Sequence, residues 1–163
     1  MFKYRIEIIF IKKNIHKVFN ISLAKVEKLE EDVLKWVRFI AIIGDNIAEF
    51  TGINAARAIL RAAGRKFVKT SVEKVDDPIK TAIAEIKKLG LFEDVTPGEK
   101  GEYLIKNCKL AEYLEANSQK PGEHPVCYFS FGLIEGCLRE VGIDSNVQFR
   151  ERKENVCVEK WHD

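Results

Sequence analysis

The chemistry open to this 163-residue chain depends first on its four cysteines, because thiolates bind metals and act as nucleophiles. The sequence has Cys108, Cys127, Cys137 and Cys157 but no Cys-x-x-Cys pair, so the common zinc-ribbon pattern is absent. Cys127 and Cys137 lie ten residues apart, which on a helix means roughly 80° around and about 15 Å along the axis. These two thiols cannot bind one ion together. Metal binding, catalysis and burial all remain open for the cysteines.

Cys127 belongs to the segment HPVCYFSFGLIEGCLREVG, residues 124–142. Pro125 at its start and Gly142 after its end predict a helix over 125–141. Cys127 falls in the first turn, where the N-terminus of a helix favours a thiolate. Cys137, further along, is expected to be a small core residue.

Gly132 and Gly136 lie one turn apart on one face of this predicted helix. Without side chains, they would let another backbone or a ligand approach closely. We expect the helix to pack on the sheet through both glycines, with tight packing against another helix as the alternative.

The last segment of the chain could supply partners for Cys127. Residues 146–151 and 155–161 alternate in period two around a short turn, 152–154, which predicts a hairpin. Glu151 ends the first strand, Glu154 lies in the turn, and Cys157 lies in the returning strand. Two thiolates and a carboxylate suit tetrahedral zinc, although buried cysteines are commoner than liganded ones.

The N-terminal region predicts a strand and a long helix. Residues 3–11 alternate as a strand does. From Ser22, a good N-cap, residues 23–37 place apolar side chains at helical spacing, and the apolar character continues to Gly52. We expect an amphipathic helix here.

Two further helices follow. One covers residues 53–64, with Gly64 as its C-cap. The other begins with Asp77 as cap and Pro78 in the first turn, and ends at Gly90.

The centre of the chain predicts two antiparallel strands, 91–95 and 103–108, before a polar loop at 116–125. Strands therefore occur at both ends and in the middle, with helices grouped between them. This order predicts an α+β fold, a single domain with a largely antiparallel sheet and helices packed on it.

Composition excludes several classes of protein. Apolar residues make up 46% and charged residues 32%, as in ordinary globular chains, and no apolar run reaches the roughly 20 residues of a membrane span. The basic and apolar N-terminus is interrupted by Glu7 and has no signal-peptide cleavage site, so we expect a cytoplasmic protein. Basic residues of the first half are scattered among acidic ones, so we expect no nucleic-acid partner.

Catalytic motifs are also absent. The sequence contains no GxGxxG after a strand, no Walker loop, no HExxH and no GxSxG, so no nucleotide cofactor is expected. His16, His124 and His162 are too scattered to indicate a triad by spacing. A non-catalytic protein is favoured over an enzyme.

Three segments together resemble the 4-vinyl reductase domain family: AEFTGINAARAILRAAGRK, HPVCYFSFGLIEGCLREVG and VQFRERKENVCVEKW. The resemblance covers roughly residues 40–161, and its most specific part is Cys-x4-Gly-x3-Gly at Cys127, Gly132 and Gly136. The family is named for a protein of bacteriochlorophyll synthesis and includes the sensor domain of aromatic-responsive transcription activators. It is more distantly similar to a small subunit family of the TRAPP vesicle-tethering complex. Its members are typically small-molecule-binding and often dimeric, and several hold a structural zinc.

The resemblance implies that Cys127, Glu151 and Cys157 are zinc ligands. The family's hairpin reads Glu-x-x-Cys and then, after a longer turn with glycine, Cys. This chain has a shortened turn and lacks the middle cysteine. Glu154 could replace it, His124 could reach in from the preceding loop, or the metal could have been lost.

We expect a non-catalytic module that binds a small apolar or aromatic ligand between helices and sheet, and that signals through a downstream protein partner. The expected pocket residues, each of which could equally be a core residue, are Phe50, Ile59, Phe129, Leu133 and Phe149. The alternatives are an accessory subunit or enzyme of tetrapyrrole-type reduction, suggested by the family name alone, and an assembly subunit like those of TRAPP.

Residues 1–39, the strand and amphipathic helix, are expected to join the fold or to form a dimer interface. Residues 40–163 would be the ligand-binding domain. The apolar stripe between Leu23 and Trp36 exceeds what a small sheet can cover, so we expect a homodimer through it.

Overall fold

A computed structural model describes residues 23–68 and 76–162 of the chain. The chain divides into two compact units, Met1–Lys35 and Trp36–Asp163. The strand expected at residues 3–11 lies outside the described residues.

Helix α2 (Leu23–Thr51) begins in the first unit and ends in the second. Within the first unit, the Lys35 ammonium lies 2.8 Å from the Glu31 carboxylate, an exposed pair one turn apart. The helix ends where expected, at Gly52, whose φ of 84° lies in the left-handed region that glycine enters freely.

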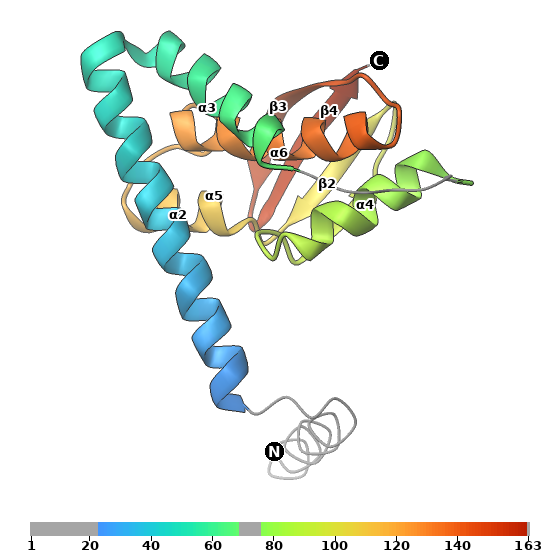
Figure 1. Cartoon of the computed structure of the whole chain (residues 1–163), viewed down its shortest axis with the longest axis horizontal. Helices are drawn as coiled ribbons and strands as arrows, with labels where there is room; N and C mark the ends of the chain where they lie inside the picture. The colour runs from blue at the N-terminus through green and yellow to red at the C-terminus, as the bar shows by residue number, and fades with distance from the viewer. Residues whose placement is uncertain (1–22, 69–75, 163) are drawn as a thin grey trace. The chain divides into compact units, whose positions relative to one another are not determined.

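The second unit is an α+β fold, as predicted. Four more helices, α3 (Ile53–Phe67), α4 (Pro78–Lys88), α5 (Lys109–Ala116) and α6 (Pro125–Glu140), accompany one sheet in the described residues. Its strands are β1 (Asp94–Pro97), β2 (Glu102–Lys106), β3 (Asn146–Lys153) and β4 (Val156–His162). They are ordered β1-β2-β4-β3, and every pair is antiparallel. Figure 1 labels β2, β3 and β4 of this sheet.

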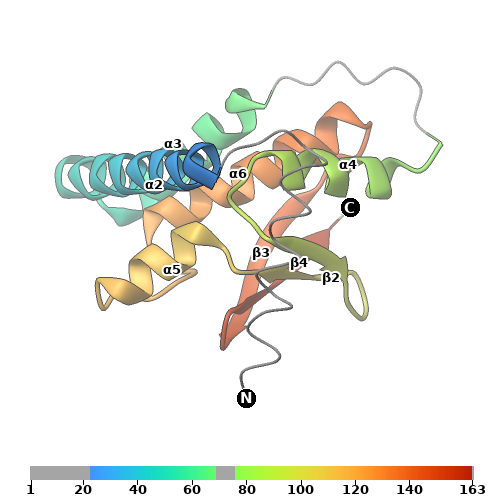
Figure 2. The ribbon, with the colours of Figure 1, turned by 90° about the horizontal axis from the view of Figure 1, so that it is seen from below.

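Helix α6 is the centre of this unit. It lies between the sheet and α3 (Figure 2), and thirteen of its sixteen residues are buried. A helix that is apolar nearly all round, as this one is, must be covered on every side. The predicted helix over 125–141 is thereby confirmed.

Three glycines set the distance between α3 and α6. A Cβ on Gly132 would lie 2.1 Å from the Arg61 carbonyl oxygen, and one on Gly64 would lie 2.3 Å from that of Phe129. Gly136 approaches Val68, at 2.9 Å from Cγ2 to the added Cβ. Two expectations are therefore wrong: Gly64 is inside α3 and is not its C-cap, and the glycines of α6 face α3 and not the sheet. Glycine is needed here because two backbones touch.

Several predicted boundaries hold and others shift. Asp77 caps α4 by accepting a hydrogen bond from the Lys80 N–H at 3.0 Å, as expected. The sequence reading missed α5, a helix of only eight residues that follows directly on β2. The last turn is Glu154–Asn155, with Glu154 at a φ of 52°, so the expected turn at 152–154 is wrong. Arg152 and Lys153 belong to β3 and pair with Cys157 and Val156.

Candidate functional site

A pocket of about 280 Å³ is formed by α3, α6, β3 and the loop before α6. Three aromatic rings and one guanidinium form its walls. We call it the aromatic pocket, and its lining residues are Arg61, Gly122, Tyr128, Phe131, Val147, Gln148 and Phe149. Ligand pockets usually occupy roughly 300–1,000 Å³, so this one suits a molecule with a single ring.

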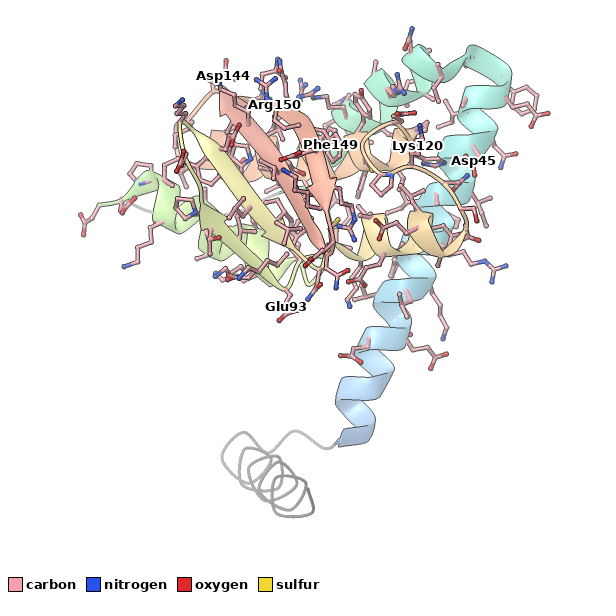
Figure 3. The ribbon with its side chains drawn as sticks, turned by 180° about the vertical axis from the view of Figure 1, so that it is seen from behind. Asp45, Glu93, Lys120, Asp144, Phe149 and Arg150 are labelled. Carbon is pink, nitrogen blue, oxygen red and sulfur yellow. The ribbon has the colours of Figure 1, made fainter. Side chains whose placement is uncertain are left out.

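Two of the three rings lie close together because of their spacing along α6. Tyr128 and Phe131 are three residues apart on α6, and their ring centroids lie 5.2 Å apart in an edge-to-face arrangement. Phe149 on β3 faces the loop that carries Lys120 and Gly122 (Figure 3). A Cβ on Gly122 would lie 2.3 Å from the Phe149 ring, so only glycine fits under the ring. The loop therefore closes one side of the pocket by direct contact.

Two arginines of α3 lie against the rings of α6. The Arg57 Cζ lies 5.2 Å from the Tyr128 ring centroid, and Arg57 Nε donates to the Glu123 carbonyl oxygen at 3.0 Å. The Arg61 Cζ lies 6.0 Å from the Phe131 ring centroid. Both distances are typical of cation–π interactions, so a positively charged guanidinium lies next to each ring.

Arg61 is fixed by a buried carboxylate, Glu135, whose side chain is only 1% exposed. Its Nε lies 3.0 and 3.1 Å from the two Glu135 oxygens, and its Nη2 contacts the same carboxylate. Arg65 Nε and the Val147 N–H also donate to Glu135, at 2.6 and 2.8 Å. Burial raises the pKa of Glu135, but the hydrogen bonds from Arg61 and Val147 outweigh it, and the pKa is lowered overall. The pair stays ionised and holds Arg61 in the pocket wall.

A second feature is a buried cluster of three thiols and a carboxyl: Cys108 at the start of α5, Cys127 on α6, and Cys157 and Glu159 on β4. Burial raises the pKa of Cys127 to about 12 and that of Cys157 to about 11. Cys157 and Glu159 lie close enough to Cys127 that negative charge on either of them would raise the pKa of Cys127 further. Burial therefore outweighs the helix N-terminus and favours the thiol form of Cys127.

Glu159 is the most unusual member of the cluster. It is 3% exposed, and its Oε2 is buried with no hydrogen-bond partner in the described part of the chain. Burial raises its pKa to about 8 and outweighs the lowering effect of the neighbouring Trp161 side chain, so Glu159 is mostly protonated at pH 7. On the sheet it pairs directly with Tyr103 of β2 and with Phe149 of β3. It therefore lies directly across the strands from one wall of the aromatic pocket.

The three ligands implied by the family resemblance do not come together. Cys127 and Cys157 share the cluster, but Glu151 is exposed and its carboxylate lies 2.6 Å from Lys153. A register shift between Phe149 and Glu151 makes Arg152 the partner of Cys157. Directly paired side chains share a face of a sheet, so Arg152 faces inward and Glu151 outward. Arg152 Nη1 lies 3.2 Å from the Cys157 sulfur.

The two alternative ligands are also elsewhere. Glu154 is exposed in the turn. His124 caps α6 by accepting the Val126 N–H at Nδ1, and its Nε2 lies 2.7 Å from Asp45. No group of three His, Cys, Asp or Glu side chains in the described ranges could hold a metal ion. Of the three implied ligands, the described structure therefore brings Cys127 and Cys157 together and leaves Glu151 apart from them, and the zinc stays a prediction.

Four of the five expected pocket residues do not line the aromatic pocket. Phe129 and Leu133 are core residues, whereas Phe50 is 83% exposed and Ile59 is also exposed. Phe149 alone of the five lines the aromatic pocket. The sequence reading missed Arg61, Tyr128 and Phe131, although both aromatic residues belong to the segment 124–142 that contains Cys127.

No family model and no curated protein matches this chain. The resemblance to the 4-vinyl reductase domain family therefore stays a prediction. Across the described helices, none combines the length and apolar character needed to cross a bilayer.

Proposed function

We propose that the chain is a non-catalytic module that binds a small aromatic ligand in the aromatic pocket. The observation that carries this proposal is the convergence of Tyr128, Phe131 and Phe149 on a space of about 280 Å³ beside the Arg61 guanidinium. Aromatic rings stack against a planar ligand in edge-to-face or offset arrangements, which favours a ring over an aliphatic chain.

The polar groups of the pocket suit recognition and not catalysis. Among the described residues, its lining includes no Ser, Cys, His, Asp, Glu or Lys, so this lining offers no nucleophile with an adjacent base. Arg61 Nη1 makes no hydrogen bond to the described residues, and Tyr128 and Gln148 carry further polar groups at the wall. These groups would fix the orientation of a ligand that carries a hydroxyl or carboxylate.

The partly apolar surface of α2 and α3 supports a homodimer. Four exposed apolar side chains of α2 lie on one side of the helix. At about 100° per residue, they fall within an arc of about 120° around the helix axis: Trp36, Phe39, Ile42 and Phe50. On α3, Ile53, Ile59 and Phe67 are also exposed.

The size of this apolar surface favours a second copy of the chain as its partner. A full aromatic side chain covers roughly 150–250 Å². The exposed portions therefore amount to several hundred Å², similar in order to the roughly 800 Å² that each partner buries in a standard interface. We include the homodimer in the proposed function, with any signal passed to a downstream protein.

Ligand titrations test the binding proposal. Phenol, benzoate and toluene, added in turn to the full chain and followed by ligand-observed NMR, cover a neutral polar, an anionic and an apolar ring. Phe131→Trp should fill the pocket and weaken binding about fivefold or more, since overpacking costs at least about 1 kcal/mol.

The matched control is Leu34→Ala, which removes an exposed apolar side chain of α2 outside the aromatic pocket and outside the proposed dimer surface. It should bind as the wild type does. Binding of none of the three probes, or equal weakening by Leu34→Ala, would contradict the proposal.

A further inference from the structure

A second pocket, of about 380 Å³, lies where α6 ends and β3 begins. It shares no lining residue with the aromatic pocket. We call it the arginine pocket, and its lining residues are Arg65, Glu135, Arg139, Asp144, Ser145 and Asn146.

The hydrogen-bond donors of this pocket are largely unused. Arg65 donates through Nε to Glu135, and neither Nη makes a hydrogen bond to any described residue. With the residues that the structure describes, Arg139 makes one long side-chain contact, 3.6 Å from its Nη2 to Asp144 Oδ1. The Ser145 Oγ is buried without a partner among the residues that the structure describes. A buried hydroxyl left unpaired costs free energy unless something else binds it.

The acceptors, in contrast, are occupied or turned outward. Both Glu135 oxygens accept hydrogen bonds from Arg61 and Arg65, and one also accepts from the Val147 N–H. The Asn146 Oδ1 accepts from Arg61 Nη2. The Asp144 side chain is 93% exposed, so its long contact with Arg139 is weak.

The charges of the lining balance, with two guanidiniums, Arg65 and Arg139, and two carboxylates, Glu135 and Asp144. Glu135 is also paired with Arg61 from outside the lining, so Arg139 faces only the exposed Asp144 carboxylate. A ligand with several acceptor oxygens and negative charge would satisfy the free donors, and guanidiniums match the oxygens of phosphate in pairs.

We infer that the arginine pocket binds a phosphate group through Arg65, Arg139 and Ser145. The same chemistry serves inorganic phosphate and the phosphoryl group of a larger molecule. The site is separate from the aromatic pocket and does not depend on the function proposed for it.

Calorimetric titration of the full chain at low ionic strength tests this inference, with inorganic phosphate and glycerol 3-phosphate as separate probes. We expect saturable binding of at least one probe. Tighter binding of glycerol 3-phosphate assigns the site to a phosphorylated molecule, and tighter binding of inorganic phosphate assigns it to the free ion.

Two variants and a matched control make the test specific. Arg139→Gln should weaken binding about tenfold or more, because it removes a charged donor. Ser145→Ala should also weaken binding yet leave the thermal midpoint unchanged or higher, because it removes an unpaired buried hydroxyl. Arg38→Gln, at an exposed arginine of α2 outside the pocket, should bind like the wild type. No saturable binding of either probe, or equal weakening by Arg38→Gln, would overturn the inference.

Discussion

Replacing Glu159 with glutamine should make the protein more stable at neutral pH. Glu159 is buried, and its Oε2 has no partner within the described ranges. Its pKa is raised by burial from 4.5 to about 8. Between these two values the folded protein holds a proton that the unfolded chain releases, so stability falls as pH rises through this window. Glutamine has the shape of the protonated acid and no charge to lose.

The size of the effect follows from the two pKa values. Each pH unit in the window costs about 1.4 kcal/mol. From 4.5 to pH 7 the loss is about 3 kcal/mol, and it levels off at about 5 kcal/mol above pH 8. Glu159→Gln should therefore match the wild type at pH 4, exceed it by about 3 kcal/mol at pH 7, and exceed it by about 5 kcal/mol at pH 9.

Equilibrium unfolding in urea at these three pH values measures the difference directly. Glu151→Gln is the matched control, since Glu151 is an exposed glutamate of the same sheet and should change stability by no more than about 0.5 kcal/mol. A Glu159→Gln variant whose stability relative to the wild type does not depend on pH would refute the reasoning. So would a variant less stable than the wild type at pH 7.

Three further predictions concern packing, assembly and metal. Gly132→Ala should cost roughly 1–3 kcal/mol or more in urea unfolding, because its Cβ would meet the Arg61 carbonyl oxygen at 2.1 Å; an unchanged midpoint would mean that α3 and α6 separate freely. Sedimentation at micromolar concentration should give about twice the 18.7 kDa chain mass, with Phe50→Glu shifting it to monomer, and a wild type that is monomeric throughout would exclude the dimer. The zinc implied by the resemblance predicts about one equivalent in protein prepared without added metal, lost in Cys127→Ser. Less than about a tenth of an equivalent would contradict it.

Local signals were enough to predict much of the fold. Pro125 and Gly142 predicted the two ends of α6, and the Asp77–Pro78 pair predicted the start of α4. Both depend on residues within a few positions of the helix end, where capping chemistry is local. The antiparallel sheet followed in the same way from alternation and turns.

What could not be predicted depends on contacts between distant residues. Gly64 has the local features of a C-cap, and only its contact with α6 shows why it is glycine. The register shift in β3 decides that Arg152 and not Glu151 joins Cys157, because a one-residue slip exchanges the faces of a strand. Arg61 and Glu135 are 74 residues apart, so no spacing rule could pair them.

The proposed function predicts where a ligand binds, and protein-observed NMR tests this most directly. In a titration of the isotope-labelled full chain with phenol, benzoate and toluene, at least one probe should shift the amide signals of Gly122, Tyr128 and Gln148 more than any others. These residues line the aromatic pocket on three different segments. Shifts confined to the exposed apolar residues of α2 and α3, or no saturable shift with any probe, would contradict a ligand site in the aromatic pocket.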